Sequence, residues 1–190
     1  MWSAISPFMR MGRSLRFRAR GALLLLGFHS VTCASASVAK AVATVRLAGG
    51  KARLFKNGHP LVFGGAVGSV SGSPGAGEVV DVVDGKANLV GWGVYNPHSM
   101  YRVRLLAAAH EEEHIGHRDL KALLRHRLAS AQQLRSACGL PSASTNAYRL
   151  VNSEGDRLSG LTVDVFGGTA VAVTSALWLE QVSEESRASK

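Results

Sequence analysis

Hydrophobic and polar residues alternate in short runs over residues 43–110, and glycine-rich turns separate one run from the next. Residues 61–70 are apolar and β-leaning, and residues 101–105 alternate one by one. Asp84-Gly85 lies between two further apolar runs, which is a strong short-range signal for a β-hairpin. Five or six short strands over about 65 residues predict a closed or nearly closed barrel.

One short helix is expected within this β pattern. The stretch from Lys51 to Lys56 favours a helix, and Asn57-Gly58, with Pro60 two residues beyond, would end it. The helix carries three basic residues, so it is also the first place to look for contacts with an anionic partner.

The spacing of the apolar residues changes from residue 115 onward. Leucine and alanine recur at helical spacing, which predicts an amphipathic helix that ends by Gly139, with Pro141 beyond it. Its apolar positions are Leu120, Leu123, Leu124, Leu128, Ala131 and Leu134, and the polar side chains expected mostly on its exposed surface are Arg125, Arg127, Gln132 and Arg135.

Three strand-like runs follow, at 148–152, 161–165 and 169–175. They cannot bury both faces alone, so we expect them to dock on the preceding helix or on something outside this chain. The fold class expected is mostly β with α: a barrel with one short helix, then an incomplete α+β domain over 115–179. Residues 180–190 are polar and are expected to fray as a tail.

The first 42 residues differ in composition from the rest of the chain. They are rich in arginine and serine and contain no acidic residue, a composition typical of transit peptides. We therefore expect a disordered or helical leader over 1–42 and a chloroplast or mitochondrial location. A secretory signal cleaved at Ala34-Ser35-Ala36 and an untargeted tail are the alternatives. The apolar run Ala22–Leu26 is far shorter than the roughly 20 residues that span a bilayer, so no membrane is expected as partner.

The net charge of +9 comes largely from this leader. The first forty residues contain six Lys or Arg, and the remainder has sixteen basic and thirteen acidic residues, a net charge of +3. The distribution is uneven, because the first acidic residue is Glu78. Overall charge is thus a weak indication of a nucleic-acid partner.

Several short motifs occur in a fixed order. They are His59-Pro60-Leu61-Val62-Phe63, Gly77-Glu78, Tyr95-Asn96-Pro97, Tyr148-Arg149-Leu150 and the block from Glu154-Gly155-Asp156 to Thr162-Val163-Asp164. In this order and spacing the chain resembles the front end of the RlmI-type ribosomal RNA cytosine-5 methyltransferases. Leu61 stands where that family usually has Trp, which affects whatever the ring would pack against or stack on.

The resemblance implies an RNA-binding PUA barrel over 43–110 and the start of the family's middle domain over 115–179. In that family S-adenosylmethionine (SAM) is bound by a further catalytic domain, for which a glycine-rich strand–loop–helix would be needed; neither 72–77 nor 91–93 has that context. We therefore expect RNA binding without catalysis or cofactor in this chain. The alternatives are a truncated gene product of an active methyltransferase, whose catalytic domain lies downstream or docks separately, and a protein-interaction module.

The candidate RNA contacts cluster on and after the short helix. They are Lys51, Arg53, Lys56, Asn57 and His59, and the last barrel strand adds Arg102 and Arg104 on the face opposite Tyr101, Val103 and Leu105. Lysine and arginine hold phosphates, and the groove beside this helix is where RNA usually lies in PUA domains. The alternative is a solvated helix face, since no aromatic residue is interleaved to stack bases.

Three other features have weaker functional interpretations. His110-Glu111-Glu112-Glu113-His114 matches a zinc-protease spacing, with Glu111 as general base, but a solvated charged junction is favoured and no metal site is expected. Trp92 and Tyr95 could stack bases, although packing in or at the edge of the core is favoured. Cys138 is interpreted as a small packing residue.

Overall fold

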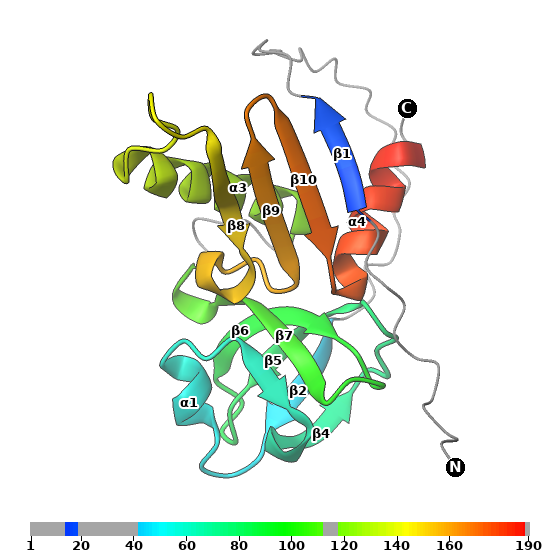
Figure 1. Cartoon of the computed structure of the whole chain (residues 1–190). Helices are drawn as coiled ribbons and strands as arrows, with labels where there is room; N and C mark the ends of the chain where they lie inside the picture. The colour runs from blue at the N-terminus through cyan, green and yellow to red at the C-terminus, as the bar shows by residue number, and fades with distance from the viewer. Residues whose placement is uncertain (1–13, 19–41, 112–117, 189–190) are drawn as a thin grey trace, which may run out of the picture.

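The computed structural model describes residues 14–18, 42–111 and 118–188, which form two sheets with a helix or helices beside each (Figure 1). The lower sheet in the figure is the predicted barrel. Its elements are β2 (Ala43–Leu47), α1 (Ala52–Lys56), β3 (Leu61–Phe63), a 3-10 turn η1 (Gly64–Ala66), β4 (Val67–Ser71), β5 (Val79–Val83), β6 (Leu89–Tyr95) and β7 (Tyr101–Ala108).

The six strands of this sheet have the order β3-β7-β6-β5-β2-β4, in which only β2 and β5 run parallel. The sheet curls around a core of alternate side chains, among them Val45, Val62, Val80 and Val103, and Phe55 of α1 packs against them. Valine is frequent here because its branched side chain suits the pleated, buried surface. The predicted mostly-β fold with one short helix is confirmed; the curled sheet is a half-barrel, with β3 and β4 at the two ends of its strand order.

Strand β7 contributes side chains to two cores. Val103 belongs to the barrel core, whereas Leu106 and Ala107 belong to a second core. Leu106 is skipped in the pairing of β7 with β6. A bulge of this kind changes the face of the sheet on which the following side chains lie. Gly93 lies at the bulge, where a Cβ would come within 2.0 Å of the Arg104 carbonyl oxygen, so only glycine fits this close approach of the two backbones.

The second region, upper in Figure 1, combines a small sheet with two helices. Its elements are the 3-10 turn η2 (Ala109–Glu111), α3 (Leu120–Ala137), β8 (Ala147–Asn152), the 3-10 turn η3 (Ser153–Asp156), β9 (Leu161–Phe166), β10 (Thr169–Thr174) and α4 (Leu177–Ala188). The sheet is antiparallel with the order β1-β10-β9-β8. The Asp119 side chain caps α3 by accepting from the N–H groups of Lys121 and Ala122.

The two regions share packing. Trp92 and Val94 of barrel strand β6 are buried in one cluster with Leu123 of α3, Val151 of β8 and Trp178 of α4. The strands of the second region therefore pack on their preceding helix, as expected, and also on the barrel and on α4.

Three expectations about the chain outside the barrel need correction. Residues 180–190 were expected to be a polar tail, but residues up to Ala188 continue α4, because Trp178, Leu179 and Val182 bury one face of a helix there. The leader was expected to be disordered or helical, but Ser14–Arg18 form strand β1, paired antiparallel to β10. Residues 1–13 and 19–41 lie outside the described residues.

The third correction concerns Arg127, which was placed on the exposed surface of the helix. Its side chain is buried, because it turns inward to the carboxylate of Glu111. Among the described helices, none combines the length and the apolar character that crossing a membrane requires.

Candidate nucleic-acid interface

Helix α1 presents basic side chains to solvent. Phe55 anchors its inner face in the barrel core, whereas Lys51, Arg53 and Lys56 are exposed. Among the described residues, Lys51 and Arg53 form no ion pair or side-chain hydrogen bond. Both ammonium and guanidinium are thus available to an external anion.

Lys56 is held by an internal partner. Its Nζ donates to Asp84 Oδ2 at 2.8 Å, and Asp84 also accepts from the Lys86 N–H and from both the N–H and the side-chain amide of Asn88. The Lys56 bond, followed by those of Asn88 and Lys86, lowers the pKa of Asp84 well below its usual range despite the opposing effect of desolvation. Asp84 stays ionised and joins the β5–β6 turn to the end of α1.

A row of rings begins where α1 ends. The ring centroids of Phe55 and His59 are 6.0 Å apart, those of His59 and Phe63 5.7 Å, and those of Phe63 and Tyr101 5.2 Å. We call His59, Phe63 and Tyr101 the ring row. The Arg104 guanidinium extends it, with its carbon 5.8 Å from the Tyr101 centroid.

The ring row exists because β7 does not alternate strictly. Val62 pairs with Val103 and Phe63 with Tyr101, so Arg102 is skipped in the β3–β7 ladder. This bulge turns Tyr101 outward to Phe63, on the side where Arg104 also lies, rather than inward with Val103. The expected separation of Tyr101 from Arg104 on opposite faces is therefore wrong.

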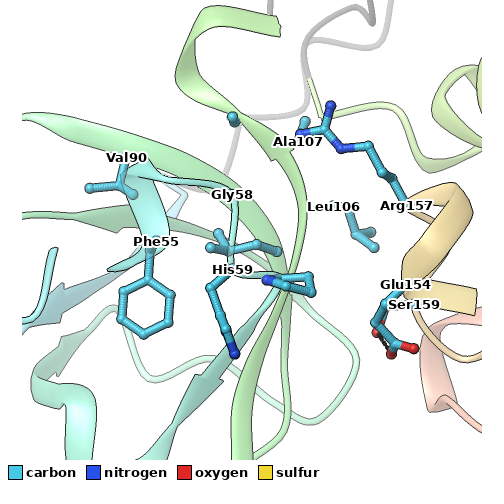
Figure 2. Close-up of a pocket in the computed structure, with 12 residues that line it drawn as sticks. Phe55, Gly58, His59, Val90, Leu106, Ala107, Glu154, Arg157 and Ser159 are labelled. Carbon is cyan, nitrogen blue, oxygen red and sulfur yellow. Dashed lines mark hydrogen bonds between the residues drawn. The ribbon is translucent and has the colours of Figure 1, made fainter. Parts of the chain in front are cut away.

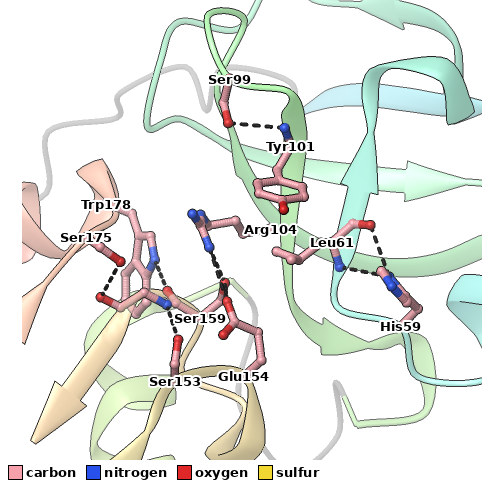
Figure 3. Close-up of polar contacts among 11 residues, drawn as sticks. His59, Leu61, Ser99, Tyr101, Arg104, Ser153, Glu154, Ser159, Ser175 and Trp178 are labelled. Carbon is pink, nitrogen blue, oxygen red and sulfur yellow. Dashed lines mark hydrogen bonds and ion pairs between the residues drawn. The ribbon is translucent and has the colours of Figure 1, made fainter. Parts of the chain in front are cut away.

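The two arginines of β7 are held by the protein itself. Arg102 donates from Nη1 to the carbonyl oxygens of Pro97 and Ser99, the latter at 2.8 Å, and so fixes the β6–β7 turn. Arg104 donates to Ser159 Oγ at 2.7 Å and to Glu154 Oε1 at 3.3 Å, which joins the barrel to the second region (Figure 3).

A cleft opens where the barrel meets η3. Phe55, His59 and Val90 line it on the barrel side, and Glu154, Arg157 and Ser159 lie across it (Figure 2). His59 thus belongs to the ring row and also lines the cleft. Its Nδ1 lies 3.1 Å from the Leu61 carbonyl oxygen and 3.3 Å from the Leu61 nitrogen, contacts that orient the imidazole (Figure 3).

The structure brings five of the seven predicted RNA contacts together. Lys51, Arg53, Lys56, Asn57 and His59 occupy α1 and the turn after it. Arg104 approaches this group through the ring row, whereas Arg102 serves the turn before β7. Sequence reasoning missed Phe63 and Tyr101, because a strand bulge cannot be read from alternation alone.

The remaining motifs have structural roles among the described residues. Glu111 lies in η2 and accepts from the Ala108 N–H, Arg127 and Arg157. Burial raises the pKa of Glu111, but these donors outweigh it, so its pKa lies below the usual value. In the described part of the chain no three His, Cys, Asp or Glu residues gather as a metal site; Glu112, Glu113 and His114 lie outside it.

Trp92 and Tyr95 pack in or at the edge of a core, which is the interpretation that the sequence favoured. Trp92 is buried in the second core, and Tyr95 packs partly buried against the barrel core. Cys138 is not a packing residue: it is exposed at the end of α3.

Comparison with known proteins identifies the barrel. Residues 45–108 match the family described as PUA-like domain. The Ribosomal RNA large subunit methyltransferase I of Alteromonas mediterranea is 39% identical over 113 residues, 60% of this chain and 27% of that protein. The protein of the same name from Erwinia tasmaniensis is 35% identical over 130 residues, 67% of this chain and 31% of that protein.

A solved structure extends the likeness of fold. A Streptococcus mutans chain, described as a candidate SAM-dependent methyltransferase, superposes with a TM-score of 0.59 at 16% identity, covering 75% of this chain and 35% of that one. The curled sheet, α1 and the match define a PUA-like domain. The chain belongs to the ribosomal RNA large subunit methyltransferase I family, and it spans about 30% of the length of these curated relatives.

Proposed function

We propose that this chain binds RNA through α1 and the ring row, as the RNA-binding part of a ribosomal RNA methyltransferase family member. The observation that carries the proposal is the pair of exposed cations at the start of α1. Lys51 and Arg53 are exposed without an ion-pair partner among the described residues, directly before the turn that carries His59. The names of the relatives support ribosomal RNA as the class of ligand.

The mechanism is phosphate contact combined with the shape of the barrel. Each basic side chain that neutralises a phosphate releases condensed counterions, so affinity should fall steeply as salt concentration rises. Lys56 contributes less than Lys51 and Arg53, because Asp84 already neutralises part of its charge.

The test is the double variant Lys51→Ala/Arg53→Ala in the full chain. Binding to a fluorescein-labelled stem–loop transcribed from large-subunit ribosomal RNA is followed by fluorescence anisotropy at several salt concentrations. We expect about tenfold weaker binding and a slope of log K against log salt that is shallower by about 1.4, two contacts at about 0.7 each.

The matched control removes two basic residues from α3 instead. Lys121→Ala/Arg125→Ala changes the net charge equally but leaves α1 intact. If both double variants weaken binding to the same extent, only overall charge matters and the proposed surface is wrong. Loss confined to the α1 variant supports it.

A second candidate function is SAM-dependent methylation of ribosomal RNA by the protein as a whole. The relatives' names favour it, although the chain aligns with only 27% and 31% of the two described above. Incubation of the chain with tritiated SAM and large-subunit ribosomal RNA tests whether this segment suffices. Incorporation of label would contradict the expectation that it binds without catalysis.

The organelle location stays a proposal and has a structural consequence. If residues 1–42 are removed as a transit peptide, β10 loses its neighbour β1. Fusion of residues 1–42 to a fluorescent protein, with imaging and N-terminal sequencing of the mature product, tests both import and cleavage.

A further inference from the structure

We infer that the ring row is a stacking platform for unpaired nucleotides, so that the barrel prefers single-stranded segments of RNA to duplex. This inference rests on the proposed RNA binding and names the form of RNA that the surface selects. It starts from three rings that lie outside both cores.

The position of Phe63 is unexpected for a large apolar residue. Its side chain remains 40% exposed, although Val62 beside it is buried in the barrel core. His59 and Tyr101 flank it, and Met100 before Tyr101 is also exposed. An exposed ring flanked by two half-buried rings and an exposed methionine forms an apolar surface of the kind that recurs at binding sites.

The charges around the rings favour nucleic acid over an apolar protein partner. Arg104 stands against Tyr101 at one end of the row, where Ser159 and Glu154 hold it. The exposed cations of α1 precede His59 at the other end. Aromatic faces beside basic groups bind single strands, because every base has a face to stack while the backbone contacts the cations.

Duplex RNA cannot use such a platform. Its bases are already stacked on one another and paired, so only their edges and the backbone are accessible. The cations of α1 should hold duplex and single strand alike, and only the single strand should gain from Phe63 and its neighbours. The two kinds of contact are therefore separable by experiment.

The test uses Phe63→Leu in the full chain with two probes: a fluorescein-labelled 12-nucleotide oligo(U) and a 12-base-pair RNA duplex. Leucine keeps apolar bulk but removes the aromatic face. We expect about tenfold weaker binding of oligo(U), the loss of one stacked base, and less than a twofold change for the duplex. Tyr101→Leu should act in the same direction.

Phe166→Leu is the matched control, because Phe166 is also exposed but lies at the β9–β10 turn. It should change neither affinity, and circular dichroism checks that each variant is folded. The platform is refuted if Phe63→Leu and Tyr101→Leu leave oligo(U) binding unchanged, or weaken both probes equally, while Lys51→Ala/Arg53→Ala still weakens both. If the wild-type chain binds the ribosomal stem–loop but neither probe, the platform is refuted and the proposed function stands; if it binds none of the three RNAs, both fail.

Discussion

Helix α1 and the second region differ in how their basic side chains are held. In the second region several arginines are paired: Arg135 binds Asp156 with two bonds of 2.6 Å, and Arg149 binds Asp164 at 2.9 and 3.0 Å. On α1, Lys51 and Arg53 have no such partner among the described residues. A paired arginine serves the fold, whereas an exposed cation is available to a ligand.

This contrast refines the expectation from net charge. The chain outside its first forty residues has a net charge of only +3, yet residues 41–77 contain four Lys or Arg and no acidic residue. Arg104 belongs to both regions, because it touches the ring row while bonding Glu154 and Ser159. The second region therefore holds the Arg104 end of the proposed RNA surface in place.

The largest effect on stability should come from Arg127→Ala. The Arg127 and Glu111 side chains are only 9% and 13% exposed, so removing the guanidinium leaves a poorly solvated carboxylate. Glu111 keeps Arg157 and the Ala108 N–H, and we expect a loss of about 3 kcal/mol in the free energy of unfolding. Urea unfolding followed by tryptophan fluorescence measures it.

The comparison variant is Arg149→Ala, whose ion pair lies at the surface. The Arg149 side chain is 50% exposed, so its removal should lower the free energy of unfolding far less than Arg127→Ala does. Neither variant should alter RNA affinity. A change in RNA affinity in Arg127→Ala, measured below its unfolding transition, would mean that the second region contributes directly to the interface.

The next effect is a loss of stability in acid. It should be larger in the second region, where several carboxylates have a lowered pKa (Glu111, Asp119, Glu154, Asp156 and Asp164), than in the barrel, where the pKa of Asp84 is lowered. Burial raises the pKa of Asp156, but the bonds from Arg135 and the Asn152 N–H outweigh it, so the pKa is lowered; Arg149 lowers that of Asp164. As pH falls, these two carboxylates therefore bind protons in the unfolded chain at a higher pH than in the folded chain. Stability is complete well above the unfolded pKa of about 4 and falls as pH drops through and below it.

Hydrogen exchange at successive pH values between 7 and 3 should show this. Amides of β8 and β9 should lose protection at a higher pH than those of β2 and β6. The variant Asp156→Asn/Asp164→Asn should be less stable at neutral pH and should show a flatter pH profile. If the barrel strands lose protection first, the ion pairs are not what makes the second region sensitive to acid.

The sequence predicts a part of this fold when the residues that determine it lie close together along the chain. Local patterns located α1, the β5–β6 hairpin and α3, because each depends on neighbouring residues. Helix α4 was missed: Trp178, Leu179 and Val182 form barely more than one apolar turn before polar residues begin. Strand β1 pairs with β10 across more than 150 residues, a contact that no local pattern indicates.

In the candidate site, too, local features were predicted and long-range contacts were not. The cations of α1 were predictable as a cluster because they lie within six residues of one another. The ring row was not, since Phe63 and Tyr101 meet only through a bulge at Arg102. The burial of Arg127 likewise depends on its ion pair with Glu111. Glu111 lies outside α3, so the spacing of residues within the helix does not predict this burial.

The smallest effect we expect is a gain of affinity, from Asp84→Asn. This change removes the carboxylate that holds Lys56 and leaves an amide that still accepts from the Lys86 and Asn88 N–H groups. A third exposed cation then becomes available on α1. Binding of the ribosomal stem–loop should tighten about threefold, and the salt slope should steepen by about 0.7, one additional contact.

Asp164→Asn removes the same charge from the second region and releases Arg149 in place of Lys56. If position rather than total charge decides RNA binding, this variant should leave both the affinity and the salt slope as they are in the wild type. Equal tightening by the two variants would show that RNA responds only to net charge. In that case the two regions would not differ in function, and the exposed cations of α1 would have no special role.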